Sequence, residues 1–221
     1  MSHTYCYGVH SCDEDNKGDE GLVDCASMSY QTYITDAVVV GSYHSNTADK
    51  SYLLFTQRAG MLYATARSVR EERSKQRYAL QDFSHITVTL VKGKAGWRIG
   101  SVEAYENFYA DAASRLARGS IVRLTKTLRR YVQGEVIDED LYRTYVESLS
   151  LLATECEART AYERCAEVQL LSHLGYVASD AVLAPLLSTA LHDLSPAVVG
   201  AHEATLEDLY RGAQAVSHLE R

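Results

Sequence analysis

The sequence predicts an α+β protein, with a small closed β-barrel in its N-terminal half and an α-helical domain after it. Between residues 30 and 106, short segments rich in β-branched and aromatic residues are separated by turn signals. From residue 108 onward, apolar residues recur with the period of about 3.6 that an amphipathic helix requires. Five short strands that close on themselves are typical of a barrel of the OB type.

Each expected strand is bounded by glycine or polar residues. In the third segment, alternation places Tyr63 and Arg67 on the polar face. In the fourth, Ile86, Val88 and Leu90 form the apolar face. The expected strands are residues 32–41, 50–58, 61–68, 85–92 and 97–105, with turns at Ala59-Gly60 and residues 93–96, and a connection at residues 68–84 where such barrels usually carry a helix or an extended loop.

The helical part contains several start and stop signals. Asp138 is placed to cap a helix, and Gly134 and Gly175 occupy positions suited to C-caps. Pro196 is expected to interrupt the chain before the last helix, and Cys165 lies on an apolar stripe, as a buried thiol would. The expected helices are residues 111–132, 138–155, 159–174, 181–191 and 202–219.

Charge divides the chain into three parts, which we expect to be an acidic extension (1–27), a barrel domain (28–107) and a helical domain (108–221). The whole chain has a formal net charge of −7. Residues 28–110 nevertheless hold ten Lys/Arg and seven Asp/Glu, a balance of +3, whereas the flanks are each at −5. Residues 1–27 lack periodicity, so we expect disorder there, and Met28 is an alternative start. Local charge decides which partners a surface attracts.

Several classes of site are not expected. There is no apolar run of membrane-spanning length and no secretory signal, which favours a cytoplasmic protein with free thiols. No phosphate-binding loop or catalytic motif is present, so we expect neither an enzyme nor a cofactor. The five cysteines include no C-x₂-C pair, so a metal site is not expected. Cys6, His10, Cys12 and Cys25 could in principle ligate a metal, but their spacing matches no standard site, and Cys156 and Cys165 are expected to be free thiols.

A cluster of cations at residues 67–77 carries the strongest chemical signal. Five cations within this segment, beside a strand that presents Tyr63, suit a phosphate chain whose bases stack on an aromatic ring. A solvated loop that serves only solubility is the alternative. The predicted DNA-binding residues are Lys50, Arg58, Tyr63, Arg67, Arg70, Arg73, Lys75, Arg77, Lys92, Arg98, Arg123 and Lys126.

A second basic group lies in the first expected helix. Arg123 and Lys126 are three residues apart and share one edge with further cations. This edge is either a solvated helix face, a continuation of the DNA path, or a dock for an acidic partner tail. The group comprises Arg115, Arg118, Arg123, Lys126, Arg129 and Arg130.

Four aromatic residues of the barrel segment are expected in the core and not on the binding surface. They are Tyr52, Phe55, Phe83 and Trp97.

Short motifs within residues 33–93 indicate a family. They comprise Thr35, Ala37, Val38, Ala48, Asp49, Lys50, Leu53 to Thr56, Gly60, Arg67, Arg70, Ser74, Arg77, Leu80, Gln81 and Phe83. At these positions the segment resembles the N-terminal domain of the bacterial RecO family of recombination mediators, although Arg67 stands where the family usually has Lys and Asp82 replaces the usual Pro. Residues 131–152 and 162–176 resemble the family's helices more weakly, and the four-cysteine zinc knuckle that often follows is absent from the sequence.

The resemblance implies a DNA repair and homologous recombination mediator of the RecF pathway. Such a protein binds single-stranded and duplex DNA, anneals complementary strands without ATP, and helps to load RecA onto DNA coated with single-strand-binding protein. The implied partners are RecR and the C-terminal tail of single-strand-binding protein, with RecA contacted indirectly, in the cytoplasm at the nucleoid. The alternatives are an OB-fold module that binds protein or oligosaccharide, and an enzyme that uses the barrel as a substrate platform.

Overall fold

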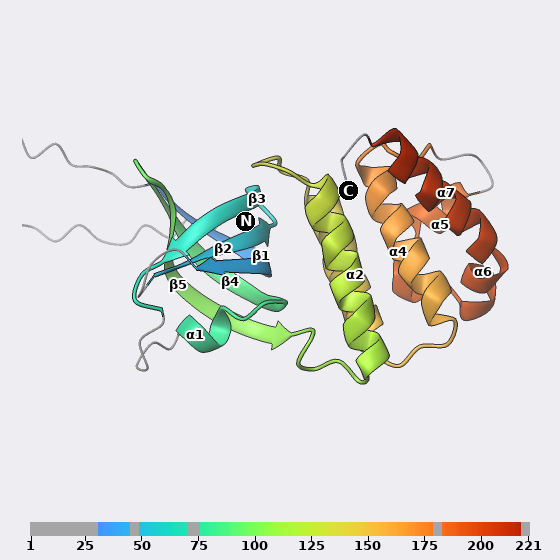
Figure 1. Ribbon diagram of the computed structural model, residues 1–221, viewed down its shortest axis with the longest axis horizontal. Helices are drawn as coiled ribbons and strands as arrows, with labels where there is room; N and C mark the ends of the chain where they lie inside the picture. The colour runs from blue at the N-terminus through green and yellow to red at the C-terminus, as the bar shows by residue number, and fades with distance from the viewer. Residues whose placement is uncertain (1–30, 45–48, 70–75, 179–182, 218–221) are drawn as a thin grey trace, which may run out of the picture.

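Five strands close into a barrel in the computed structural model, which describes residues 31–44, 49–69, 76–178 and 183–217 (Figure 1). The strand order is β1-β2-β3-β5-β4, and every neighbouring pair is antiparallel except β3 with β5. The strands are β1 (Gln31–His44), β2 (Lys50–Thr56), β3 (Gly60–Ala66), β4 (Ser84–Gly93) and β5 (Gly96–Asn107). The predicted fold class, an OB-type barrel followed by helices, is confirmed.

Apolar side chains at alternate positions of the strands fill the interior of the barrel. Leu62 and Ala64 on β3 and the apolar face of β4 all point inward and are buried, as the pattern predicted. The first strand ends three residues later than expected, because a β-bulge between Val39 and Gly41 carries the strand past the glycine. The interior is completed by Ala37, Val39, Tyr52, Leu54, Ala66, Trp97 and Ile99.

Apart from α1, which lies between β3 and β4, the helices follow the barrel and lie beside it (Figure 1). Their bounds are α1 (Gln76–Ala79), α2 (Arg115–Tyr131), α3 (Glu139–Ala153), α4 (Arg159–His173), α5 (Ala184–Ser188), the 3₁₀ helix η1 (Leu191–Asp193), α6 (Pro196–Ala201) and α7 (Glu203–Val216). None of the helices in the described ranges has the length and apolar character needed to cross a membrane.

Capping residues mark several of the helix ends. The side chain of Asp138 accepts a hydrogen bond from the Leu141 amide at 2.8 Å, as expected of an N-cap. Gly175 adopts a left-handed φ of 78° just after α4, where a C-cap glycine belongs. The expectation for Pro196 was wrong, because this proline begins the short helix α6 instead of breaking helical structure. Its ring fits the first turn of a helix, where its missing N–H costs nothing, and Ser195 caps that turn.

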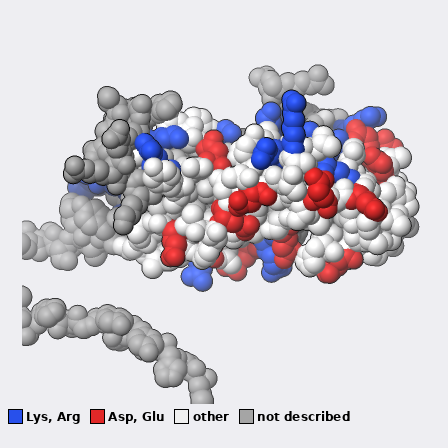
Figure 2. Space-filling model, turned by 90° about the horizontal axis from the view of Figure 1, so that it is seen from below, with Lys and Arg blue, Asp and Glu red and all other residues white. Residues whose placement is uncertain are grey.

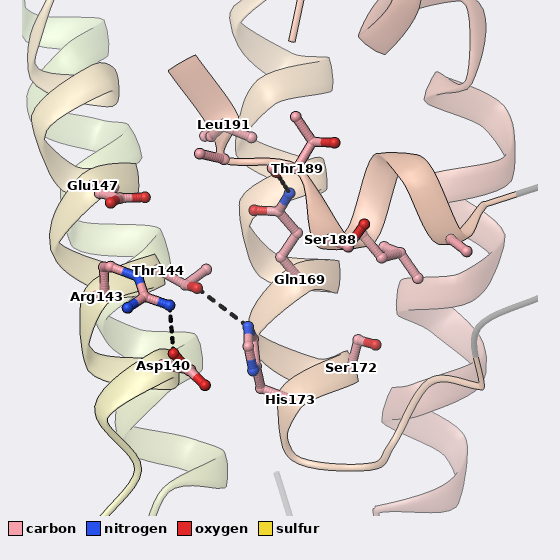
Figure 3. A pocket seen from close by; sticks show the side chains of 13 residues that line it. Asp140, Arg143, Thr144, Glu147, Gln169, Ser172, His173, Ser188, Thr189 and Leu191 are labelled. Atoms are coloured by element: carbon pink, nitrogen blue, oxygen red, sulfur yellow. Dashed lines mark hydrogen bonds and ion pairs between the residues drawn. The ribbon is translucent and has the colours of Figure 1, made fainter. Parts of the chain in front are cut away.

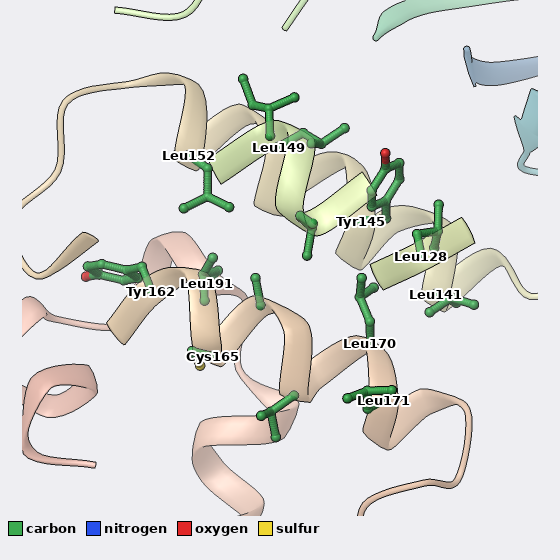
Figure 4. Close-up of a cluster of buried hydrophobic side chains, with 14 of the residues drawn as sticks. Leu128, Leu141, Tyr145, Leu149, Leu152, Tyr162, Cys165, Leu170, Leu171 and Leu191 are labelled. Carbon is green, nitrogen blue, oxygen red and sulfur yellow. The ribbon is translucent and has the colours of Figure 1, made fainter. Parts of the chain in front are cut away.

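One apolar cluster joins the barrel to the helices. Val38, Phe55 and Met61 point outward from the barrel and belong to the same buried cluster as the cores of α2, α3 and α4. Figure 4 shows the helical part of this cluster, in which Tyr145 and Cys165 are fully buried. The buried thiol of Cys165 was predicted, and burial raises its pKa to about 12.

The connection between α2 and α3 also ties the helices to the barrel. The amide of Met61 donates to the Gly134 carbonyl at 3.0 Å, and Glu135 accepts from the Trp97 indole at 2.8 Å. Gly60, with a φ of +67°, lies so close to Val136 that an added Cβ would be 2.4 Å from its carbonyl oxygen. Barrel and helices are therefore fixed to one another by polar as well as apolar contacts, and the division into domains at residue 107 stays a prediction.

Candidate nucleic-acid interface

A row of polar side chains crosses the outer face of the barrel. In the strand register, Tyr43 on β1 is opposite Ser51 on β2, which is opposite Thr65 on β3, which is opposite Arg98 on β5. Neighbouring strands are about 4.8 Å apart, so the row spans about 14 Å. Successive residues of a strand alternate between faces, so Tyr63 and Arg67 flank Thr65 on the same outer surface.

Arg67 and Arg98 share one hollow on this face. Each side chain is exposed, and the two come together because β3 and β5 pair in parallel at Thr65 and Arg98. Gln76 of α1 donates to the Gly100 carbonyl at 2.8 Å and closes one side. The hollow has a volume of about 490 Å³ and is lined by Thr65, Arg67, Gln76, Val91, Arg98, Ile99 and Gly100. Because no carboxylate lies among these residues, the site favours an anion.

Lys50 and Arg77 share a second hollow, next to α1. The Lys50 ammonium is 5.1 Å from the centre of the Tyr52 ring, and the Arg77 guanidinium is 5.1 Å from that of Tyr78. Asp82 also lines this space, so its charge is mixed. The hollow has a volume of about 560 Å³, and the other lining residues are Ser42, Tyr52, Val69, Leu80, Gln81, Phe83, Asn107, Tyr109 and Ala110.

Helix α2 supplies a third group of cations. Among its 17 residues, six are Lys or Arg and none is Asp or Glu. Tyr109, which stacks on Phe83 at 5.4 Å, lines the second hollow and also one on α2, so it joins the two surfaces. The Arg118 side chain donates to the Tyr109 carbonyl at 3.1 Å. The α2 hollow has a volume of about 400 Å³ and is lined by Tyr109, Arg115, Arg118, Gly119, Val122, Arg123 and Lys126.

Two of the predicted cations are already paired with carboxylates. Arg123 donates two hydrogen bonds to Glu163, at 2.8 and 2.6 Å, and these bonds raise the pKa of the guanidinium. Lys92 lies 3.2 Å from Glu135 and 4.8 Å from the centre of the Trp97 ring. Within the described residues, no carboxylate lies within ion-pair distance of Lys50, Arg67, Arg77, Arg98 or Lys126. This second set is therefore the better candidate for phosphate contacts.

The structure does not bring all the predicted residues together. Arg58 lies in the turn between β2 and β3, at the opposite end of β2 from Lys50, so it stands apart from the hollows. Arg70, Arg73 and Lys75, which belong to the predicted basic loop, lie outside the described residues.

Charge over the molecule as a whole is mixed. Figure 2 shows Lys and Arg interspersed with Asp and Glu over the face that is seen from below. A pocket between α3, α4 and the α5–η1 segment is also mixed, because Arg143 is paired with Asp140 and Glu147 is nearby (Figure 3). Its volume is about 470 Å³. This pocket does not select for a polyanion as the first and third hollows do.

Three exposed tyrosines were missed by sequence reasoning. Tyr43 lies beyond Gly41, the expected end of the first strand, and Tyr109 follows the last strand. Tyr78 lies in α1 and is 64% exposed. Only Tyr78, which directly follows Arg77, carries a local signal in the sequence. The predicted core aromatics are confirmed, with Tyr52, Phe55 and Trp97 buried and Phe83 half-buried.

The chain was compared with known proteins. No family model matches it. A DNA repair protein RecO of Acetivibrio thermocellus is 25% identical over 148 residues, which cover 64% of this chain and 57% of the relative. A RecO protein of Symbiobacterium thermophilum is 28% identical over 153 residues, which cover 65% of this chain and 57% of the relative. A RecO protein of Desulfitobacterium hafniense is 33% identical over 76 residues, which cover 34% of this chain and 28% of the relative.

The chain is similar to RecO proteins. The signal is weak but consistent across these relatives, and it confirms the resemblance expected from the motifs. The similarity to RecO spans little more than half the length of the first two relatives.

Proposed function

We propose that this protein is a non-enzymatic DNA-binding protein of DNA repair and recombination. The observation that carries the proposal is the pair of cationic hollows, one around Arg67 and Arg98 on the barrel and one on α2. Both present guanidinium or ammonium groups with few competing carboxylates. Such groups neutralise phosphates, and the exposed tyrosines beside them offer rings on which unpaired bases stack. The relatives that the chain resembles are DNA repair proteins, which supports the same process.

The proposed action is annealing of complementary strands without nucleotide. Two polyanionic strands repel each other, and a cationic surface lowers that repulsion because its Lys and Arg side chains neutralise phosphates on both strands. Base pairing then supplies the free energy, and no covalent bond is made or broken. By similarity to RecO, the proposal extends to RecR and the tail of single-strand-binding protein as partners, to loading of RecA, and to a cytoplasmic location at the nucleoid.

The test is a fluorescence-anisotropy titration of single-stranded and duplex oligonucleotides at two salt concentrations, followed by an annealing assay without nucleotide. We expect salt-sensitive binding and faster annealing. A folded chain that binds neither oligonucleotide at low salt would overturn the proposal and favour the OB-fold protein-interaction module instead.

A further inference from the structure

Two exposed tyrosines lie together where the barrel meets α2. Tyr43 on β1 is 40% exposed and Tyr63 on β3 is 60% exposed, and their ring centres are 5.8 Å apart with the planes tilted by 55°. Large aromatic residues on a barrel are usually buried, and the other outward-facing apolar residues of this region pack against the helices. The pair therefore presents two ring surfaces to solvent at one point of the interface.

Helix α2 holds one of these rings in place. Arg129 donates a hydrogen bond of 2.5 Å to the Tyr43 hydroxyl, and its guanidinium is 5.9 Å from the centre of that ring. The same guanidinium lies over Gly41, where an added Cβ would be only 3.3 Å from its nearest nitrogen. Glycine at this position therefore permits the close approach of the arginine. Because the ring is fixed before any ligand arrives, little rotamer freedom is left to lose on binding.

Cations lie within reach on both sides of the pair. Arg67 is four residues beyond Tyr63, about 13 Å along the strand direction, and lies on the same outer surface. On the other side, Lys126 lies one turn before Arg129 on α2. A nucleic-acid strand that crosses the barrel toward α2 would pass over the two tyrosines with its phosphates near these cations.

We propose that Tyr43, Tyr63 and Arg129 form a seat for an unpaired nucleobase, and that this seat gives the interface a preference for single-stranded over duplex nucleic acid. The inference rests on the proposed function. Unpaired bases have free faces that stack on tyrosine, whereas the bases of a duplex are stacked on one another and expose only their edges. The cluster consequently adds affinity for a single strand and none for a duplex, which contacts only the cations.

The test compares the affinities of full-length variants for oligo-dT and for a duplex of equal length, by fluorescence anisotropy at fixed salt. Tyr63→Ala is expected to weaken single-strand binding by about 5- to 150-fold, the effect of one lost stacking contact, and to leave duplex binding unchanged. Tyr43→Phe keeps the ring and removes its hydrogen bond to Arg129, so a smaller loss is expected. Tyr105→Ala is the matched control, because Tyr105 is 61% exposed but lies by Asp36 and Thr87.

A second readout reports stacking directly. An oligonucleotide that contains 2-aminopurine loses emission when the base stacks, so wild type is expected to quench it and Tyr63→Ala to quench it less. Equal loss of single-strand and duplex affinity in folded Tyr63→Ala and Tyr43→Phe, or no loss in either, would overturn the base seat. Failure of the proposed function gives a different result, because wild type itself would then bind neither oligonucleotide.

Discussion

The salt dependence of DNA binding tests the assignment of Arg67 and Arg98 most directly. Five predicted cations (Lys50, Arg67, Arg77, Arg98 and Lys126) have no described carboxylate partner. If each meets one phosphate of a single strand, log affinity falls against log salt with a slope of about −3.5, since each contact contributes about −0.7. Raising salt from 50 to 200 mM then weakens binding about 130-fold.

Replacing both arginines with alanine should remove two phosphate contacts. The slope is then expected to become about −2.1, and the same rise in salt should weaken binding only about 20-fold. The measurement is a titration of labelled oligo-dT at four or more salt concentrations. The control is Arg143→Ala with Arg211→Ala, which removes the same total charge from side chains that are paired with Asp140 and Glu207. An unchanged slope in the Arg67/Arg98 variant, or an equal change in the control, would refute the assignment.

Three further predictions concern the scaffold. Phe55→Ala should cost about 3–5 kcal/mol of unfolding free energy in urea, because Phe55 is 1% exposed among the cores of barrel and helices, and a loss below about 1 kcal/mol would contradict this packing. Gly60→Ala should lower the melting temperature more than Gly96→Ala does: both glycines have positive φ, but only at Gly60 does the added Cβ meet backbone, and equal losses would argue against that contact. The Trp97 indole and Lys92 lower the pKa of Glu135, so its stabilising contribution is present above the ordinary carboxyl pKa and is lost as pH falls through the lowered value. The fluorescence of Trp97, the single tryptophan, should therefore change as acid protonates Glu135, and this change should be absent in Glu135→Gln. If the change persists in the variant, a group other than Glu135 causes it.

Much of the barrel could be predicted from the sequence because its strands are half-buried. Inward residues such as Ile86 and Val88 alternate with polar ones, and this period is visible without any tertiary information. The bulge at Val40 could not be predicted in this way. Glycine at position 41 indicates a strand end in local terms, whereas the pairing of β1 with β2 continues to His44.

The site was less predictable because tertiary pairing decides it. Arg67 and Arg98 are far apart in the sequence and meet only through the parallel contact of β3 and β5. The ion pair of Arg123 with Glu163 joins two helices in the same manner, so no local pattern distinguishes this arginine from Lys126. Composition identified the cations, and the fold determines which of them remain open to a ligand.

Val38, Phe55 and Met61 form an apolar seam between barrel and helices, and this seam determines how a shortened chain would behave. A fragment that stops at Asn107 would turn these side chains toward water, and exposed apolar area of this kind promotes self-association. Polar replacements at the seam would be needed to keep such a fragment monomeric. The intact seam also fixes the orientation of α2 relative to β1. A nucleic-acid strand that lies across both elements can therefore bind without a hinge motion of the protein.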